Sequence, residues 1–228
     1  MALQKQFKRK DLKKPDLLHV LTVRFFNYYE KNRLAMIAAV CGLLIVVLGA
    51  GGFIYNRQLQ EMEMESLYYT MVKVWAEKKD KSLGNAIKRL QDIIAKIDEG
   101  KVKQRAKLLL ADALFESKKF EQAIPLYTEV QEKSEAGQLD YDLARVGLGY
   151  SLEAKKDYNK AIEVYKSVIN GNTNYPLFYI YFGLARCQSE SGDNASAQLA
   201  LREMLNKFPE HGDIEKAQTM LKKLDDTA

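Results

Sequence analysis

The hydrophobic positions of this chain follow two different patterns. From Leu34 to Tyr55, 22 consecutive residues include no Asp, Glu, Lys, Arg or His, although the whole chain is 29% charged. From residue 57 onward, apolar residues recur at three- and four-residue spacing, which is typical of amphipathic helices. Because a helix rises about 1.5 Å per residue, the uncharged stretch is about 33 Å long, enough to cross a bilayer core. The patterns predict an all-α protein with one transmembrane helix, residues 34–55, ahead of a helical domain, residues 56–228.

An internal repeat predicts the architecture of the helical domain. Alanines recur at intervals of 37, 38 and 36 residues, at Ala86, Ala123, Ala161 and Ala197. A larger residue follows each alanine by four positions: Leu90, Tyr127, Tyr165 and Leu201. The residue twelve positions before each alanine is small except in the first repeat: Val74, Ala111, Gly149 and Ala185. This spacing is typical of the tetratricopeptide repeat, in which two antiparallel helices approach closely where small residues meet.

We therefore predict a tetratricopeptide-repeat-like α-solenoid of about four helical hairpins. Residues 212–225 are expected to form an amphipathic helix that covers the open end of the stack. The expected repeat-packing residues are the small residues at the helix crossings and the large ones between hairpins: Ala86, Ala111, Ala123, Tyr127, Gly149, Ala161, Tyr165, Ala185 and Ala197. The first repeat departs from the motif at Val74, and the fourth at Gln188, a position where a large apolar residue belongs. An unrelated bundle of amphipathic helices is the alternative.

Charged residues around the uncharged stretch predict its orientation. Residues 1–33 hold nine Lys and Arg against three acidic residues, a net charge of +6, which leaves the remainder of the chain at −1. Because basic flanks stay in the cytoplasm, we predict a bacterial inner-membrane protein with a single span, a cytoplasmic N-terminus and a periplasmic domain. A cleaved signal peptide is disfavoured, since the basic segment and the apolar core are both too long. The near-neutral domain disfavours a nucleic-acid partner.

Residues 1–33 are predicted to form a basic cytoplasmic tail that includes a short interfacial helix, residues 16–31. Leu21, Phe25 and Tyr28 lie on one apolar stripe of that helix. Anionic lipids are the expected partner of the basic residues. Ribosomal RNA or a cytoplasmic regulator is the alternative partner of the tail.

Side chains suited to catalysis or cofactor binding are scarce. The two histidines, His19 and His211, fall on opposite sides of the predicted membrane, and the sequence has no Cys/His cluster, nucleophile elbow or phosphate-binding loop. We therefore expect no enzymatic activity, no cofactor, no metal site and no small-molecule substrate. Cys41 is expected to lie within the bilayer, with a lipoprotein cysteine as the alternative, and Cys187 to be a buried thiol.

With catalytic and cofactor roles disfavoured, the sequence favours a domain whose surface binds another protein. A stack of helical hairpins presents its first helices along a concave side, where proteins bind. The candidate binding residues are tyrosines on or near the first helices of the third and fourth repeats, because tyrosine supplies rigid, amphipathic contact area: Tyr141, Tyr150, Tyr175, Tyr179 and Tyr181. The alternative is that most of them pack between repeats. We predict a non-enzymatic protein–protein interaction module.

Three segments resemble the ancillary subunit of the SecYEG translocon, a family with a basic tail, one span and a periplasmic tetratricopeptide-repeat domain. These segments are Lys14-Pro15-Asp16, the run Tyr29-Glu30-Lys31-Asn32-Arg33, and the run from Ala106 to Ala123. The resemblance implies an accessory of the secretion channel that passes exported polypeptides to a membrane-anchored periplasmic chaperone of the prolyl-isomerase type. Its implied partners are translocon subunits, that chaperone and exported polypeptides.

Three other functions share most of these features. The first is a scaffold for envelope assembly or cell division, which has the same order of parts. The second is a membrane sensor that signals to a cytoplasmic regulator through the basic tail. The third is an organellar import receptor, whose domain faces the cytosol and therefore contradicts the predicted orientation.

Overall fold

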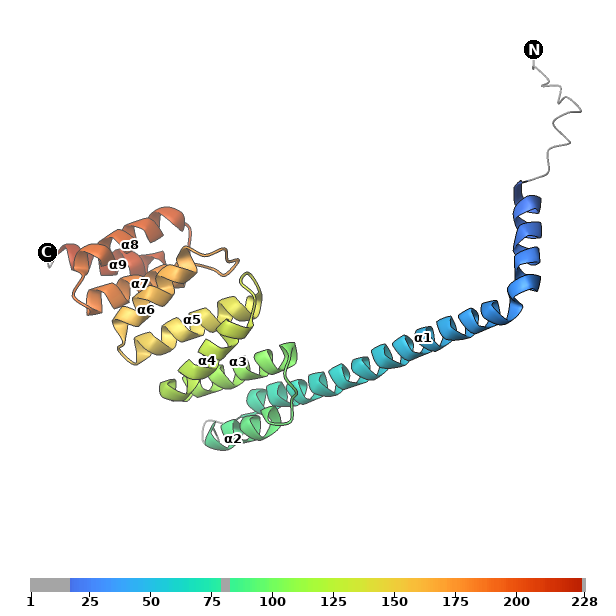
Figure 1. The fold of residues 1–228 in the computed structure, drawn as a ribbon. Coiled ribbons are helices and arrows are strands. Elements are labelled where there is room, and N and C mark those ends of the chain that lie inside the picture. The colour runs from blue at the N-terminus through green and yellow to red at the C-terminus, as the bar shows by residue number, and fades with distance from the viewer. Residues whose placement is uncertain (1–16, 79–82, 227–228) are drawn as a thin grey trace, which may run out of the picture. The chain divides into compact units, whose positions relative to one another are not determined.

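The computed structural model describes residues 17–78 and 83–226 of the 228-residue chain. Within these ranges the chain forms nine α-helices and no strand (Figure 1): α1 (Leu17–Ala76), α2 (Leu83–Ile94), α3 (Lys101–Glu116), α4 (Phe120–Lys133), α5 (Leu139–Ala154), α6 (Tyr158–Ile169), α7 (Phe178–Glu190), α8 (Asn194–Lys207) and α9 (Ile214–Asp225). The predicted all-α class is confirmed. The chain divides into two compact units, Met1–Gln60 and Glu61–Ala228.

In the first unit, α1 leaves helical geometry at a single described residue. Asn32 has φ −128° and ψ 26°, and its Nδ2 donates a 3.4 Å hydrogen bond to the carbonyl oxygen of Tyr28. The break lies between the segment predicted to be interfacial and the predicted span. Residues 1–14 and the Lys14-Pro15-Asp16 motif lie outside the described residues.

The apolar stretch distinguishes α1 from the other described helices. By length and composition alone, it is the one helix in residues 17–78 and 83–226 that is able to cross a membrane. Its large apolar side chains are exposed, with Leu34 at 81% and Ile45 at 71%. Helix α1 ends at Ala76, so its last turns include the residues expected to form the first helix of the first repeat.

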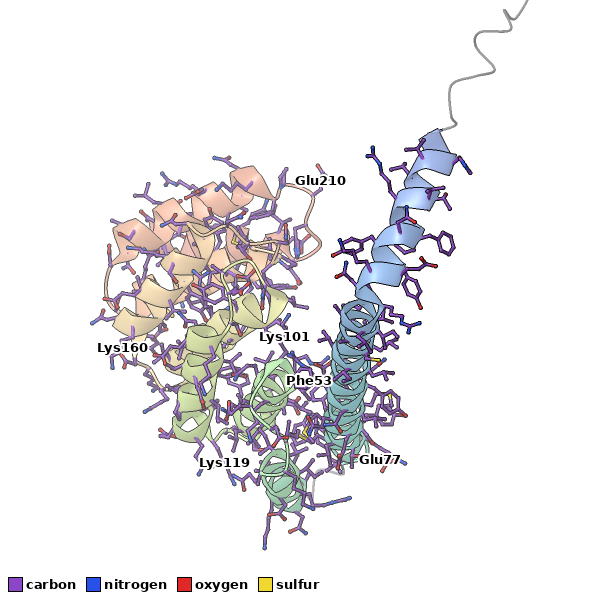
Figure 2. The ribbon with its side chains drawn as sticks, turned by 45° about the vertical axis from the view of Figure 1, so that its right-hand side comes forward. Phe53, Glu77, Lys101, Lys119, Lys160 and Glu210 are labelled. Carbon is purple, nitrogen blue, oxygen red and sulfur yellow. The ribbon has the colours of Figure 1, made fainter. Side chains whose placement is uncertain are left out.

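The second unit is a stack of helical hairpins (Figures 1 and 2). The end of α1 precedes α2, then α3 pairs with α4, α5 with α6 and α7 with α8, while α9 packs against α8. Ala217 and Leu224 of α9 are buried, as expected for a helix that covers the last hairpin. The backbones of α1 and α2 approach less closely than those of the other hairpins. Val74 explains the difference, because a branched side chain stands where the later repeats have Ala or Gly.

The three later hairpins share one turn geometry. The second residue after each first helix has a positive φ: Lys118 at 58°, Lys156 at 64° and Gly192 at 89°. The next backbone N–H donates a 2.9 Å hydrogen bond back into the helix, from Lys119 to Leu114, Asp157 to Leu152 and Asp193 to Gln188. These left-handed residues satisfy carbonyls at the helix end and reverse the chain, so that the second helix starts antiparallel to the first.

Small residues at the helix crossings carry the close packing. The exposed fraction is zero for Ala111, Ala123, Ala161, Ala185 and Ala197. The large partners are buried too, with Tyr127 and Tyr165 at 1% and 0%. Each tyrosine ring packs on a glycine of the next first helix, because a Cβ built at Gly147 would lie 2.4 Å from Cε1 of Tyr127, and one at Gly183 2.9 Å from Cζ of Tyr165. The tyrosine and the glycine are thus complementary parts of one inter-repeat contact.

Candidate protein-binding groove

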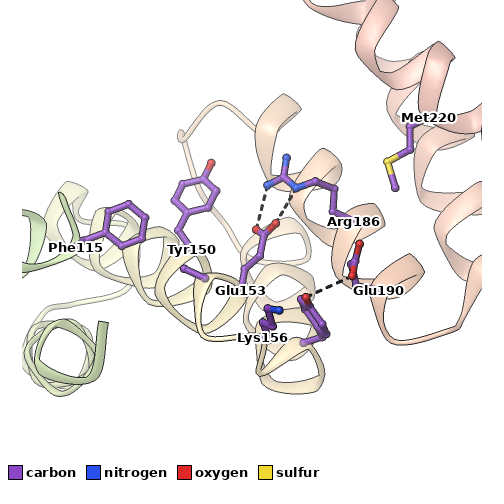
Figure 3. Close-up of a pocket in the computed structure, with 9 residues that line it drawn as sticks. Phe115, Tyr150, Glu153, Lys156, Arg186, Glu190 and Met220 are labelled. Carbon is purple, nitrogen blue, oxygen red and sulfur yellow. Dashed lines mark hydrogen bonds and ion pairs between the residues drawn. The ribbon is translucent and has the colours of Figure 1, made fainter. Parts of the chain in front are cut away.

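One position of the repeat places its side chain on the inner side of the stack. It follows the small residue of each first helix and is occupied by Trp75, Asp112, Tyr150 and Arg186. Around the last two lies an open pocket of about 570 Å³, to which α3, α5, α6, α7 and α9 contribute (Figure 3). Its lining residues are Phe115, Tyr150, Glu153, Ala154, Lys156, Tyr158, Arg186, Glu190 and Met220. We refer to this pocket, extended along α3 by Asp112 and along α1 by Tyr68, as the groove.

A network centred on Glu153 fixes the floor of the groove. The hydroxyl of Tyr165 donates a 2.6 Å hydrogen bond to Oε2 of Glu153, and Arg186 donates to the same carboxylate through Nε at 2.7 Å and Nη2 at 3.1 Å (Figure 3). The guanidinium carbon of Arg186 lies 5.0 Å from the centroid of the Phe182 ring. Burial alone lowers the pKa of Arg186, but the hydrogen bonds and charge of Glu153 outweigh it and raise that pKa. The arginine is therefore a fixed cation.

Three of the candidate tyrosines gather in this groove. Tyr150 lines the pocket; burial is the main cause that raises its pKa to about 12, and Tyr175 and Tyr179 each lie close enough to Tyr150 to contribute. The Tyr150 ring meets the ring of Tyr165 edge-on, with centroids 5.9 Å apart. Tyr179 is 45% exposed, and its hydroxyl donates a hydrogen bond to Asp213. These rings present neutral, partly exposed aromatic surface to a partner.

The other two candidate tyrosines lie elsewhere. Tyr181 is 1% exposed, and its hydroxyl donates a 2.8 Å hydrogen bond to Glu203 of α8. The guanidinium carbon of Arg145 lies 5.0 Å from the centroid of the Tyr141 ring, and the same guanidinium donates a hydrogen bond to the hydroxyl of Ser167 in α6. Tyr181 therefore faces the second helix of its own hairpin, and Tyr141 packs against Arg145, which is bound to the second helix of its hairpin. The sequence places all five tyrosines on or near the same helices, but a helix in a stack has contacts on two sides.

Sequence reasoning missed a set of polar contacts inside the hairpins. Each joins two residues that are 22 positions apart: Lys107 and Glu129 at 2.6 Å, Arg145 and Ser167 at 2.9 Å, and Tyr181 and Glu203 at 2.8 Å. Lys107 and Arg145 are only 8% and 5% exposed, although both are cationic. The available signal was a polar residue recurring four positions before the small residue of each first helix, in the middle of an apolar pattern. Such contacts hold the two helices of a hairpin in register.

The remaining chemically active side chains do not converge on the groove. Cys187 is buried in α7, and burial raises its pKa to about 12, with the nearby Glu153 contributing. The ring of His211 stacks on Phe178, and its Nδ1 accepts a hydrogen bond from the backbone N–H of Asp213. Residues 17–78 and 83–226 contain no group of three or more His, Cys, Asp or Glu residues suited to holding a metal ion.

The stack of hairpins defines a tetratricopeptide-repeat-like solenoid, a class of protein that binds other proteins. A family model described as a tetratricopeptide repeat-like domain matches residues 26–175, and a second model described as a tetratricopeptide repeat matches residues 152–224. The chain belongs to the tetratricopeptide repeat-like family. These matches establish the repeat family and not the translocon subunit.

Solved structures show the same fold at low sequence identity. A putative kinesin light chain of Podosopora anserina with nearly identical TPR-like repeats matches with a TM-score of 0.58 and 15% identity, over 71% of this chain and 85% of that one. A single-residue variant of the same protein matches equally, over 84% of its own length. A MamA RS-1 double mutant matches with a TM-score of 0.50 and 11% identity, over 72% of this chain and 95% of that one. No curated protein matches the sequence.

Proposed function

We propose that this protein is a non-enzymatic, membrane-anchored module that binds other proteins through its groove, and that it serves the SecYEG translocon by linking secreted polypeptides to periplasmic chaperones. The observation that carries the binding role is the partly exposed aromatic lining of the groove, held on the rigid Tyr165–Glu153–Arg186 network. Fixed aromatic rings beside charged groups are the composition that protein interfaces favour.

Two observations support the membrane anchor. The stretch from Leu34 to Tyr55 has no charged residue, and its large apolar side chains are exposed, as expected for a helix surrounded by lipid. Nine basic residues precede it, and the segment that follows it is much less basic, which favours an N-terminus in the cytoplasm and a domain on the periplasmic side of an inner membrane. The basic residues of the tail would also attract anionic lipids.

The translocon role rests on the resemblance of three segments to the ancillary subunit family. One of them, the run from Ala106 to Ala123, forms most of α3, its turn and the start of α4, and contributes Asp112 and Phe115 to the groove. A channel accessory needs no catalytic residue, because its task is to hold an emerging polypeptide close to a chaperone.

Site-specific photocrosslinking in native membranes tests this function. A photoreactive residue replaces Tyr150 or Tyr179 in the groove, and a matched control replaces Lys160, an exposed residue of α6 (Figure 2). We expect adducts with translocon subunits, a periplasmic chaperone or nascent secreted chains from the groove positions and not from the control. Adducts only with cell-wall or outer-membrane assembly factors would replace the translocon role with an envelope scaffold. Labelling of the domain from the cytosolic side would overturn the orientation.

A further inference from the structure

Both middle repeats hold a carboxylate at the groove with a buried tyrosine. The hydroxyl of Tyr127 donates a 2.6 Å hydrogen bond to Oδ1 of Asp112, and that of Tyr165 donates one of equal length to Glu153. Each tyrosine comes from the second helix of its hairpin, and its ring is fixed against a glycine of the next repeat. Both carboxylates are therefore oriented before any partner arrives.

The two carboxylates differ in what neutralises them. Glu153 forms an ion pair with Arg186, which directly follows the small residue Ala185 in α7. The residue in the same register of α5 is Tyr150, which has no charge to offer. Within residues 17–78 and 83–226, Asp112 accepts the hydrogen bond from Tyr127 and forms no ion pair. Among the described residues, Glu153 therefore has a cation and Asp112 has none. The two carboxylates occupy different positions of the repeat, because Asp112 follows Ala111 by one residue and Glu153 follows Gly149 by four.

The surroundings of Asp112 are suited to a cation. Burial is the main cause that raises the pKa of Tyr68 and of Tyr175, and the negative charge of Asp112 adds to both shifts, so both phenols lie within electrostatic range of its carboxylate. Asp112 is exposed to solvent on one side, and partial burial is the main cause that raises its pKa. Two nearby cations are already engaged. Lys78 pairs with Glu116 at 2.9 Å, and Arg105 pairs with Glu65 and lies over the Tyr68 ring, 4.6 Å from its centroid.

We propose that the segment recognised by the groove carries a lysine or arginine side chain that pairs with Asp112 near the phenol of Tyr175. This proposal rests on the proposed function, because it requires that the groove bind a polypeptide. A similar arrangement exists within the chain, one helical turn after Asp112. Nζ of Lys78 pairs there with the carboxylate of Glu116 in α3 and lies 3.4 Å from the centroid of the Trp75 ring. A cation held by both a carboxylate and an aromatic face gains from the two interactions together.

Selection from a random 12-residue peptide library on the full-length protein in detergent tests the proposal. Four proteins are compared: the wild type, Asp112→Asn, Tyr150→Arg and Glu163→Gln. Asn preserves the shape of the side chain and accepts the bond from Tyr127. Tyr150→Arg places an internal cation where the fourth repeat has Arg186. Glu163, an exposed carboxylate of α6, gives the matched loss of charge away from the groove. Thermal unfolding followed by circular dichroism establishes that each variant is folded.

We expect peptides selected on the wild type and Glu163→Gln to share a Lys or Arg next to apolar residues, and those selected on Asp112→Asn and Tyr150→Arg to lose it. For one selected peptide, exchanging its Lys for norleucine should weaken binding about tenfold on the wild type and less than about twofold on Asp112→Asn. Equal weakening on both proteins, or selected peptides without a basic residue, would overturn the proposal and leave the groove as the binding site. Photoadducts of the peptide outside α1, α3, α5 and α7 would overturn the groove function as well.

Discussion

The contact between Tyr127 and Gly147 offers the sharpest test of how the repeats stack. The Cβ of an alanine at position 147 would lie 2.4 Å, 2.5 Å and 2.9 Å from Cε1, Cζ and Cδ1 of the tyrosine ring. Ordinary carbon contacts are about 3.5–4.0 Å, so the ring or α5 would have to move by about 1 Å. The ring has little freedom to do so, because it is 1% exposed and its hydroxyl is bonded to Asp112.

Two opposing effects determine the change in the free energy of unfolding of Gly147→Ala. Replacing glycine by alanine inside a helix stabilises by about 1 kcal/mol. Overpacking a fixed core site costs roughly 1–3 kcal/mol, and the anchored ring places this site at the upper end. The net expectation is a loss of about 2 kcal/mol, which corresponds to a fall in Tm of about 4–8 °C for a domain of this size.

Urea unfolding of the full chain in mild detergent measures this loss. Circular dichroism reports the helices of the repeats, and the fluorescence of the single tryptophan, Trp75, reports the first hairpin. The control is Gly84→Ala in α2, where, apart from the adjoining residues and the backbone of its own helix, no atom of the described residues lies within 4 Å of the added Cβ. That variant should be as stable as the wild type or up to about 1 kcal/mol more stable.

A double-mutant cycle separates the clash from other effects. In the first two repeats the same pair of positions holds Leu90 and Leu109 instead of tyrosine and glycine. In a Tyr127→Leu background, Gly147→Ala should therefore cost at least about 1 kcal/mol less than it does in the wild type. If Gly147→Ala stabilises as Gly84→Ala does, or if its cost is unchanged in that background, the tyrosine–glycine contact does not set the spacing of the repeats.

Three further predictions concern single side chains. The Oε1 of Gln188 is buried without a hydrogen-bond partner among the described residues, so Gln188→Leu should raise the free energy of unfolding by about 1 kcal/mol in a urea titration; no gain would mean that this oxygen is satisfied in solution. Hydrogen bonds from Lys107 and Lys133 lower the pKa of Glu129, so its contribution is present above the carboxyl pKa of the unfolded chain and is lost as the pH falls through the lower, folded value. Glu129→Gln should accordingly lower Tm by about 2–4 °C at pH 7 and by less at pH 3, and an equal loss at both pH values would contradict this account. Cys187, being buried with a raised pKa, should react with a thiol reagent only as fast as the domain unfolds, and immediate labelling of the folded protein with Cys41 replaced would show that the thiol is accessible.

Several features could be predicted from the sequence because each depends on local composition or spacing. The uncharged stretch from Leu34 to Tyr55 marks a helix suited to lipid by its length and composition. The alanine spacing from Ala86 to Ala197 predicts hairpins, because only small residues allow two helices to approach closely. Even the degenerate first repeat could be anticipated, since Val74 is too large for the close crossing of helices that the later repeats show.

The composition of the groove required the tertiary structure. Periodicity shows which residues share one side of a helix, but in a stack both sides of a first helix meet other helices. It therefore does not separate Tyr150, which faces the groove, from Tyr181, which faces α8. Nor does it show that Lys107 is buried against Glu129, because the two residues are brought together only when the hairpin closes.

The sequence by itself determined the helical class, the repeat and the uncharged stretch, since these follow from interactions between residues near one another along the chain. Tertiary structure alone decided which carboxylate of the groove is neutralised. Glu153 obtains its cation from Arg186, 33 residues further along the chain, whereas Asp112 accepts a hydrogen bond from the neutral Tyr127 and forms no ion pair among the described residues. Charge pairing acts across space and depends on how successive hairpins stack, and no local pattern encodes that distance.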